Sequence, residues 1–143
     1  MPNAALVALA LQVMGGAGVG DAATIAPAIV QAVEWRAAHG LPPASDSPTL
    51  DVVLLAVYAR HESSARLHPA PESWDARALV SCGPWQMKCG VVGWPWEREY
   101  SPALQARTWL GWVSSSSLAQ VDSSKSRARR RLSEARDALR GAI

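Results

Sequence analysis

Apolar residues recur at helical spacing through the first half of the chain. Residues 3–14 form a nearly continuous apolar run that stops at a glycine cluster, which predicts a buried first helix with a glycine end. A second helix should begin at Asp21 or Thr24, whose side chains are favourable caps. A third should start near Thr49 and carry an apolar stripe that includes Tyr58.

The second half of the chain changes character. Residues 78–92 are short apolar pieces around glycines, which favours a small turn or β-hairpin over a helix. Ser101-Pro102 is a typical helix start, and a last helix with one apolar stripe is expected over about residues 123–141. We therefore expect a mainly α fold in a single domain, residues 1–143.

Composition agrees with a globular domain. Of the 143 residues, 49% are apolar, which is enough for a sizeable core and argues against disorder. The chain has seven Trp and no Phe, so Trp serves as the bulky core residue. Because indole offers a flat apolar face with a polar edge, we expect most of the seven in the core and about two at a ligand-binding surface.

Charge is distributed unevenly. Residues 123–143 hold seven basic and two acidic residues, whereas residues 1–122 hold seven basic and ten acidic ones. The basic end suits an anionic polymer of cell wall, nucleic acid or membrane surface, or it is a solvated helix face. The acidic body argues against nucleic acid. The first apolar run is too short to span a membrane, and no basic residues precede it as in a secretory signal.

One carboxylate occupies a position suited to catalysis. Glu62 lies one turn beyond Tyr58, at the end of the third helix's apolar stripe. A carboxyl group there would be partly desolvated, which raises its pKa as a general acid requires. The alternative is an ordinary surface glutamate at a fraying helix end. About twenty residues later, residues 81–87 place an aromatic and a carboxamide in a glycine turn.

Together these segments resemble the Glu-Ser … Gly-x-x-Gln-Met signature of the lysozyme-like lytic transglycosylases, which cut the glycan strands of bacterial cell walls. The resemblance covers about residues 50–130. It implies a lysozyme-like fold with a small irregular or β-hairpin element beside a groove. It also implies cleavage of the MurNAc-GlcNAc bond, with Glu62 as general acid and then base, and no cofactor or metal.

The same resemblance assigns the substrate-binding side chains. Ser63 would orient the carboxylate or contact the substrate, and Gln86 would face the glycan. Alternatively, the Ser63 hydroxyl makes local hydrogen bonds at the end of the helix, and the Gln86 amide makes hydrogen bonds to backbone groups of the loop. The remaining candidates for glycan contact are Trp85, Met87, Tyr58 and Asp122.

A third family element departs from the pattern. Residues 118–124 have Val121 where the family has tyrosine and Asp122 where it has asparagine. Loss of that tyrosine would lower activity unless Tyr58 or Tyr100 replaces it. A hydrolase would need a second carboxylate, for which the candidates are Asp122, Glu72 and Asp75.

Two cysteines bracket the glycine turn. Cys82 and Cys89 would form a disulfide in an oxidising compartment, or remain two buried thiols. Their spacing, with that of the histidines, does not match a zinc site.

Two main hypotheses follow. The first is a peptidoglycan-cleaving enzyme, either a lytic transglycosylase or a muramidase, acting as a phage endolysin or from a virion. The second is an inactive relative that binds glycan or serves as a virion structural module beside other virion proteins. A small nucleic-acid-binding protein that uses the basic tail is the third hypothesis, and no recognition motif supports it.

Overall fold

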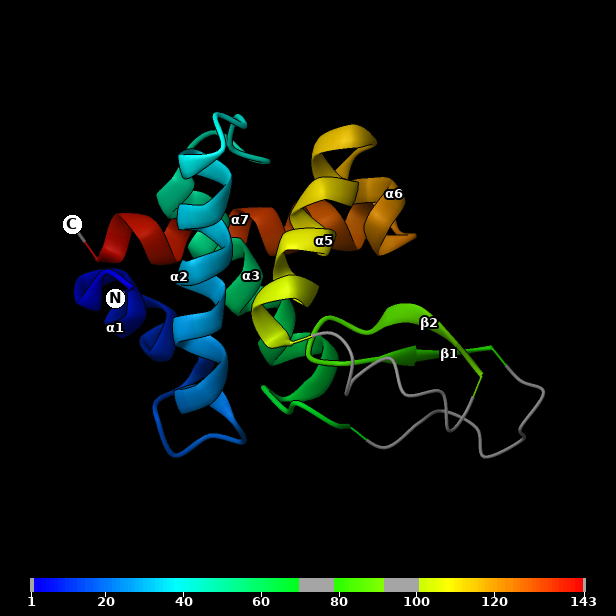
Figure 1. Ribbon diagram of the computed structural model, residues 1–143, viewed down its shortest axis with the longest axis horizontal. Helices are drawn as coiled ribbons and strands as arrows, with labels where there is room; N and C mark the ends of the chain where they lie inside the picture. The colour runs from blue at the N-terminus through cyan, green and yellow to red at the C-terminus, as the bar shows by residue number, and fades with distance from the viewer. Residues whose placement is uncertain (1, 70–78, 92–100, 143) are drawn as a thin grey trace.

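The computed structural model describes residues 2–69, 79–91 and 101–142 (Figure 1). The described part is mainly helical, as the pattern predicts, and includes one β-hairpin. In chain order the elements are α1 (Ala4–Met14), α2 (Ala22–Ala38), α3 (Pro48–Ser63), β1 (Leu79–Cys82), β2 (Met87–Val91), α5 (Pro102–Ser115), α6 (Leu118–Asp122) and α7 (Lys125–Gly141).

The connection between α1 and α2 is fastened beneath the end of α3. The backbone N–H of Asp21 donates to the carbonyl of Ala65 at 2.7 Å, and its carboxylate accepts from the N–H of Leu67 at 2.8 Å. Gly20 has a φ of +48°, and a Cβ there would lie 2.6 Å from the Ala65 oxygen. Only glycine fits this approach, so the chain that follows Glu62 is held in place.

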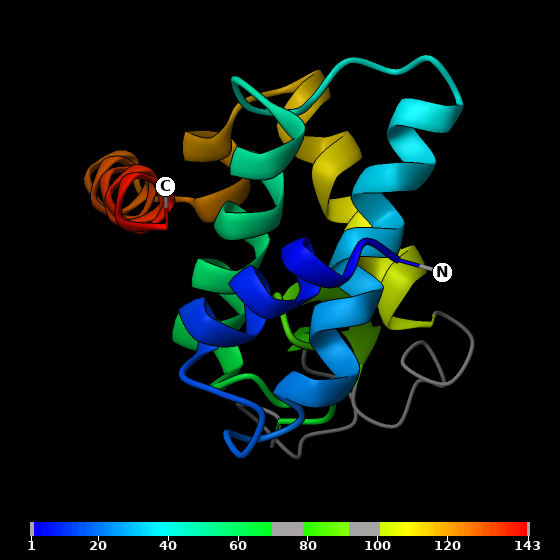
Figure 2. The same ribbon diagram turned by 90° about the vertical axis from the view of Figure 1, so that its left-hand side faces the viewer.

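Helix α3 is the central element of the fold. Ser47 caps it by accepting the N–H of Leu50 at 3.1 Å. The predicted apolar stripe is buried, but so is every residue from Leu50 to Ala59, because α1, α2 and α7 all pack around it (Figure 2). Only the last turn reaches the surface, where Arg60 and His61 are exposed and Glu62 is half-buried.

The predicted hairpin is confirmed, and one tryptophan anchors it. Strands β1 and β2 are antiparallel, with Cys82 opposite Met87. Gly83 and Gln86 take positive φ values of 76° and 49° in the turn between the strands. Within that turn the buried indole N–H of Trp85 donates to the carbonyl of Leu55 at 2.9 Å. The turn is therefore tied to the middle of α3.

The C-terminal helices complete the body. Ser101 caps α5 with Pro102 in its first turn, as predicted, and α5 packs on α2. Helix α7 packs on α3 and α6, with Ala128 and Ala135 buried toward the core. Among the residues that the structure describes, no helix is long and apolar enough to cross a membrane.

Candidate functional site

A cavity of about 290 Å³ lies where α3, the hairpin, α5 and the junction of α6 with α7 meet. Both motif segments contribute to it, because its walls include Glu62 from α3 and Gln86 from the hairpin. Among the described residues, the lining consists of Tyr58, Glu62, Ser81, Trp85, Gln86, Met87, Lys88, Trp109, Trp112, Val121, Asp122, Ser123 and Arg127.

Glu62 is ion-paired in this cavity. Its side chain is 27% exposed, and Nη1 of Arg131, from α7, donates to its Oε1 atom. A guanidinium therefore lies directly against this carboxylate, which the apolar stripe of α3 did not indicate. The adjacent His61 makes a second link to α7, with Nε2 2.7 Å from Oε2 of Glu134.

Asp122 is the second carboxylate of the cavity, and it is fully engaged. Its side chain has no exposed surface. One oxygen accepts from the hydroxyl of Tyr58, and the other accepts from Nε of Arg127 at 2.6 Å. Nη1 of Arg131 lies 3.9 Å from the oxygen that Tyr58 contacts. With both oxygens occupied and buried, Asp122 is placed to position its neighbours rather than to attack a substrate.

Tyr58 and Val121 both line the cavity. The cavity therefore contains a phenol, although residue 121 is valine where the resembling family has tyrosine. The Tyr58 ring lies 5.1 Å from that of Trp109, and the guanidinium of Arg131 lies over it at 4.8 Å. Burial first, and then the hydrogen bond to Asp122, raises the pKa of the Tyr58 hydroxyl far above its ordinary value. The hydroxyl therefore stays protonated and acts as a donor to Asp122.

The hairpin residues line the cavity, but their polar atoms are partly used locally. Trp85 and Met87 are each 3% exposed, so both form its apolar floor. The side-chain amide nitrogen of Gln86 donates to the carbonyl of Gly83 at 2.9 Å. This local bond is the alternative role considered for Gln86, although the side chain still lines the cavity.

Ser63 has the local role and is not among the lining residues. It is buried, donates to the carbonyl of Ala59 at 2.9 Å and accepts from the N–H of Arg66 at 3.1 Å. These bonds close the end of α3. Ser63 therefore supports the backbone next to Glu62, and a direct contact with substrate is not what the geometry favours.

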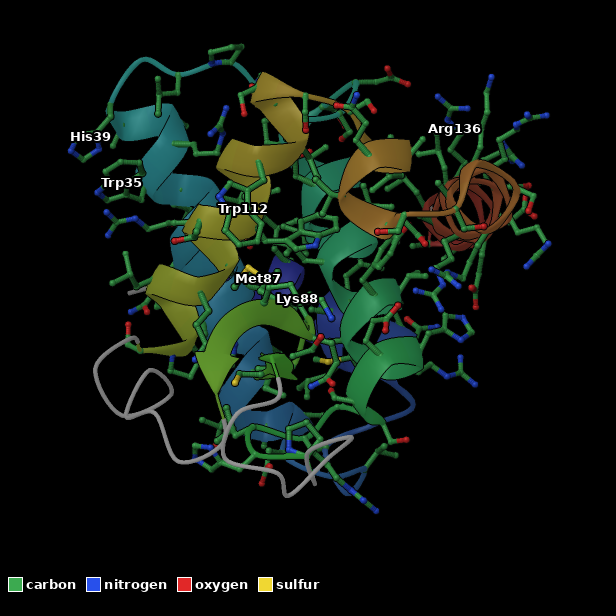
Figure 3. The ribbon with its side chains drawn as sticks, turned by 90° about the vertical axis from the view of Figure 1, so that its right-hand side faces the viewer. Trp35, His39, Met87, Lys88, Trp112 and Arg136 are labelled. Atoms are coloured by element: carbon green, nitrogen blue, oxygen red, sulfur yellow. The ribbon has the colours of Figure 1, made fainter. Side chains whose placement is uncertain are left out.

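Several lining residues were not anticipated from the sequence. Trp112 is 41% exposed at the cavity and lies one turn after the buried Trp109 on α5, a spacing that could have indicated a shared face. Trp112, Met87 and Lys88, all of which line the cavity, are labelled in Figure 3. Arg127, which lines the cavity, gave no such signal, and neither did Arg131, which pairs with Glu62, because α7 holds five other cations.

Some predictions fall outside the described residues. Glu72, Asp75 and Tyr100 belong to the ranges 70–78 and 92–100, about which nothing is stated. Cys82 is disulfide-bonded. Its pairing with Cys89 stays a prediction, because the side chain of Cys89 is not described. The described residues contain no group of three or more His, Cys, Asp or Glu that could hold a metal ion.

Comparison with known proteins gave no relative. No protein-family model, curated protein or solved structure matches this chain. A function for the cavity therefore rests on its own residues and on the motif resemblance.

Proposed function

We propose that this chain is a lysozyme-like enzyme that cleaves peptidoglycan at the MurNAc-GlcNAc bond, with Glu62 as general acid and base. One observation carries the proposal. Glu62 and Gln86 come from two sequence motifs and are 24 positions apart in the chain, and they line the same cavity. The helical body with a hairpin beside that cavity supports the lysozyme-like assignment.

The chemistry assigns a role to each oxygen of Glu62. Arg131 occupies Oε1, whereas Oε2 has no hydrogen-bond partner among the described residues. We assign the catalytic proton to Oε2. Its transfer to the bridging oxygen breaks the bond from that oxygen to the anomeric carbon of MurNAc. Arg131 then stabilises the carboxylate that remains.

The second step favours a transglycosylase over a hydrolase. The Glu62 carboxylate takes the proton of the muramoyl 6-hydroxyl, whose oxygen bonds to the anomeric carbon and yields a 1,6-anhydro sugar. A retaining hydrolase would need a second, free carboxylate. Among the described lining residues, Asp122 is the one further carboxylate, and its buried oxygens are occupied by Tyr58 and Arg127.

The cavity also offers a surface suited to a sugar ring. The exposed indole of Trp112 provides a flat apolar face, while Gln86 and Lys88 provide polar groups on the same lining. This combination is typical of carbohydrate sites, where one ring face stacks and the hydroxyls bond to polar neighbours.

A second candidate is glycan binding without cleavage. Arg131 on Oε1 of Glu62 favours it, because a substrate must share the carboxylate with a guanidinium already in place. The departure at Val121 favours it as well. In a protein that binds glycan without cleaving it, the cavity and Trp112 would still contact the sugar, and Glu62 would not act as an acid.

The deciding experiment is digestion of purified peptidoglycan by wild type and by Glu62→Gln, with products read by mass spectrometry. We expect anhydro-muropeptides from wild type and a loss of at least about 100-fold in the variant. Glu134→Gln is the matched control, since it makes the same change at an exposed glutamate on α7. Equal activity of Glu62→Gln would remove Glu62 from the mechanism. Reducing-end products would indicate a hydrolase, and no products from wild type would support the binding candidate.

A further inference from the structure

The cations of α7 divide into two sets that face different surroundings. Arg127 and Arg131 turn inward and pair with Asp122 and Glu62 at the cavity. The other five cations are exposed: Lys125, Arg129, Arg130, Arg136 and Arg140. The helix lies at the side of the body (Figure 2), and Arg136, labelled in Figure 3, pairs with Asp46 of the segment between α2 and α3.

Arg130 lies at least about 80° around the helix from the other four. Those four form a row along one side of the helix, which we call the basic ridge: Lys125, Arg129, Arg136 and Arg140. Its members are separated by four, seven and four positions, and at 3.6 residues per turn these spacings keep them within about 60° of one another. At 1.5 Å per residue the ridge is about 22 Å long. A straight row of four cations complements a linear polyanion rather than a compact ligand.

Part of the ridge is uncompensated. Arg136 pairs with Asp46 at 3.0 Å, and Arg140 pairs with Asp137. Lys125 and Arg129 have no ion-pair partner among the described residues, and they lie one turn apart. The half of the ridge nearer to the cavity therefore carries unneutralised positive charge.

The geometry points to a phosphate-bearing polymer of the bacterial envelope as the partner of the basic ridge. This inference rests on the proposed function for the location of that polymer beside peptidoglycan. The ridge would hold the protein on the wall while the cavity, on the inner side of the same helix, engages the glycan. The exposed face of α7 and the face at the cavity would then both bind the bacterial wall.

The composition of α7 disfavours other polyanions. Membrane binding by a surface helix needs an apolar face directed outward. The apolar residues of α7 instead pack on the core, either buried or partly buried. The helix also contains no aromatic residue on which single-stranded bases could stack.

The test uses Glu62→Gln protein, so that walls are bound without being cut. Sedimentation with purified walls is compared for Glu62→Gln alone, for added Lys125→Gln/Arg129→Gln, and for a control with added Arg60→Gln/Arg66→Gln. Both control arginines are exposed and lie off α7, so the net charge change is the same. Gln keeps helix propensity, so the ridge variant should fold.

We expect the ridge variant to bind walls at least about tenfold more weakly, the control to change less than about threefold, and binding to fall steeply with salt. Walls stripped of phosphate polymers should bind as weakly as the ridge variant does. Equal loss in both variants, unchanged binding to stripped walls, or tighter binding to duplex DNA or anionic vesicles would overturn the inference. If the wild-type protein binds walls through the basic ridge but releases no muropeptides, the proposed function is refuted and the inference about the ridge stands.

Discussion

The two walls of the cavity are built in different ways. The hairpin wall consists of Trp85, Gln86 and Met87, three consecutive residues in and beside one turn, and a single buried indole bond ties it to α3. The opposite wall, where α6 meets α7, is charged and is held by Asp122 and Arg131 through bonds to Tyr58 and Glu62. One wall therefore depends on apolar packing and the other on electrostatics. We therefore expect the hairpin wall to be sensitive to loss of buried apolar volume, and the α6–α7 wall to be sensitive to loss of a charged or hydrogen-bonding group.

The largest effect is expected from Trp85→Ala on the hairpin wall. The substitution empties a fully packed site and leaves the carbonyl of Leu55 without its indole donor. We expect a loss of about 3–5 kcal/mol in the free energy of unfolding, measured by chemical denaturation. A loss below about 1 kcal/mol would mean that the hairpin does not depend on this anchor.

Tyr58→Phe tests the charged wall and gives it a pH signature. Removing the hydroxyl deprives buried Asp122 of a donor and should cost about 1–3 kcal/mol. The pKa of Tyr58 is raised in the folded state, so the stability that its protonated form contributes is complete below about pH 10 and falls as pH rises further. The difference in unfolding free energy between wild type and Tyr58→Phe should therefore shrink above about pH 10. A constant difference up to pH 11 would contradict this assignment.

Arg131→Gln separates the structural and chemical roles of the ion pair. The side chain is 14% exposed and touches both Glu62 and Asp122, so we expect a loss of about 1–3 kcal/mol in stability. Cleavage of soluble glycan should fall about tenfold, because the carboxylate formed after proton transfer loses its guanidinium. A rise in activity would show instead that Arg131 blocks Glu62.

The smallest effect on stability is expected from Trp112→Ala. Because this indole is 41% exposed, its loss should change the unfolding free energy by less than about 1 kcal/mol. Affinity for a short peptidoglycan glycan should nevertheless fall about tenfold, measured by calorimetry. The contrast with Trp85→Ala would separate a tryptophan that holds the wall from one that contacts the sugar. An unchanged affinity would remove Trp112 from the proposed site.

Most of the local structure could be predicted from the chain. The cap at Ser101, the glycine end of α1 and the hairpin around Gly83 all depend on residues within a few positions of each other. The site could be predicted only in part. Tyr58, Glu62, Trp85, Gln86, Met87 and Asp122 all line the cavity, whereas Ser63 does not.

The side-chain contacts that could not be predicted join residues far apart in the sequence. Tyr58 meets Asp122 across 64 positions, and Glu62 meets Arg131 across 69. No periodicity distinguishes Arg131 from the neighbouring arginines of α7, because which side faces α3 is set by how Ala128 and Ala135 pack. The partner of each charge is thus decided by helix docking.

Residues that are close together in the chain predict the helices, the hairpin and the position of Glu62 where a buried helix reaches the surface. Those features follow from hydrophobic periodicity and capping, which act over a few residues. The ion pair of Glu62 with α7, the phenol of Tyr58 in a cavity that Val121 also lines, and the exposure of Trp112 at that cavity depend instead on the fold. Side-chain partners of this kind depend on how whole helices pack, and that packing is a property of the folded chain.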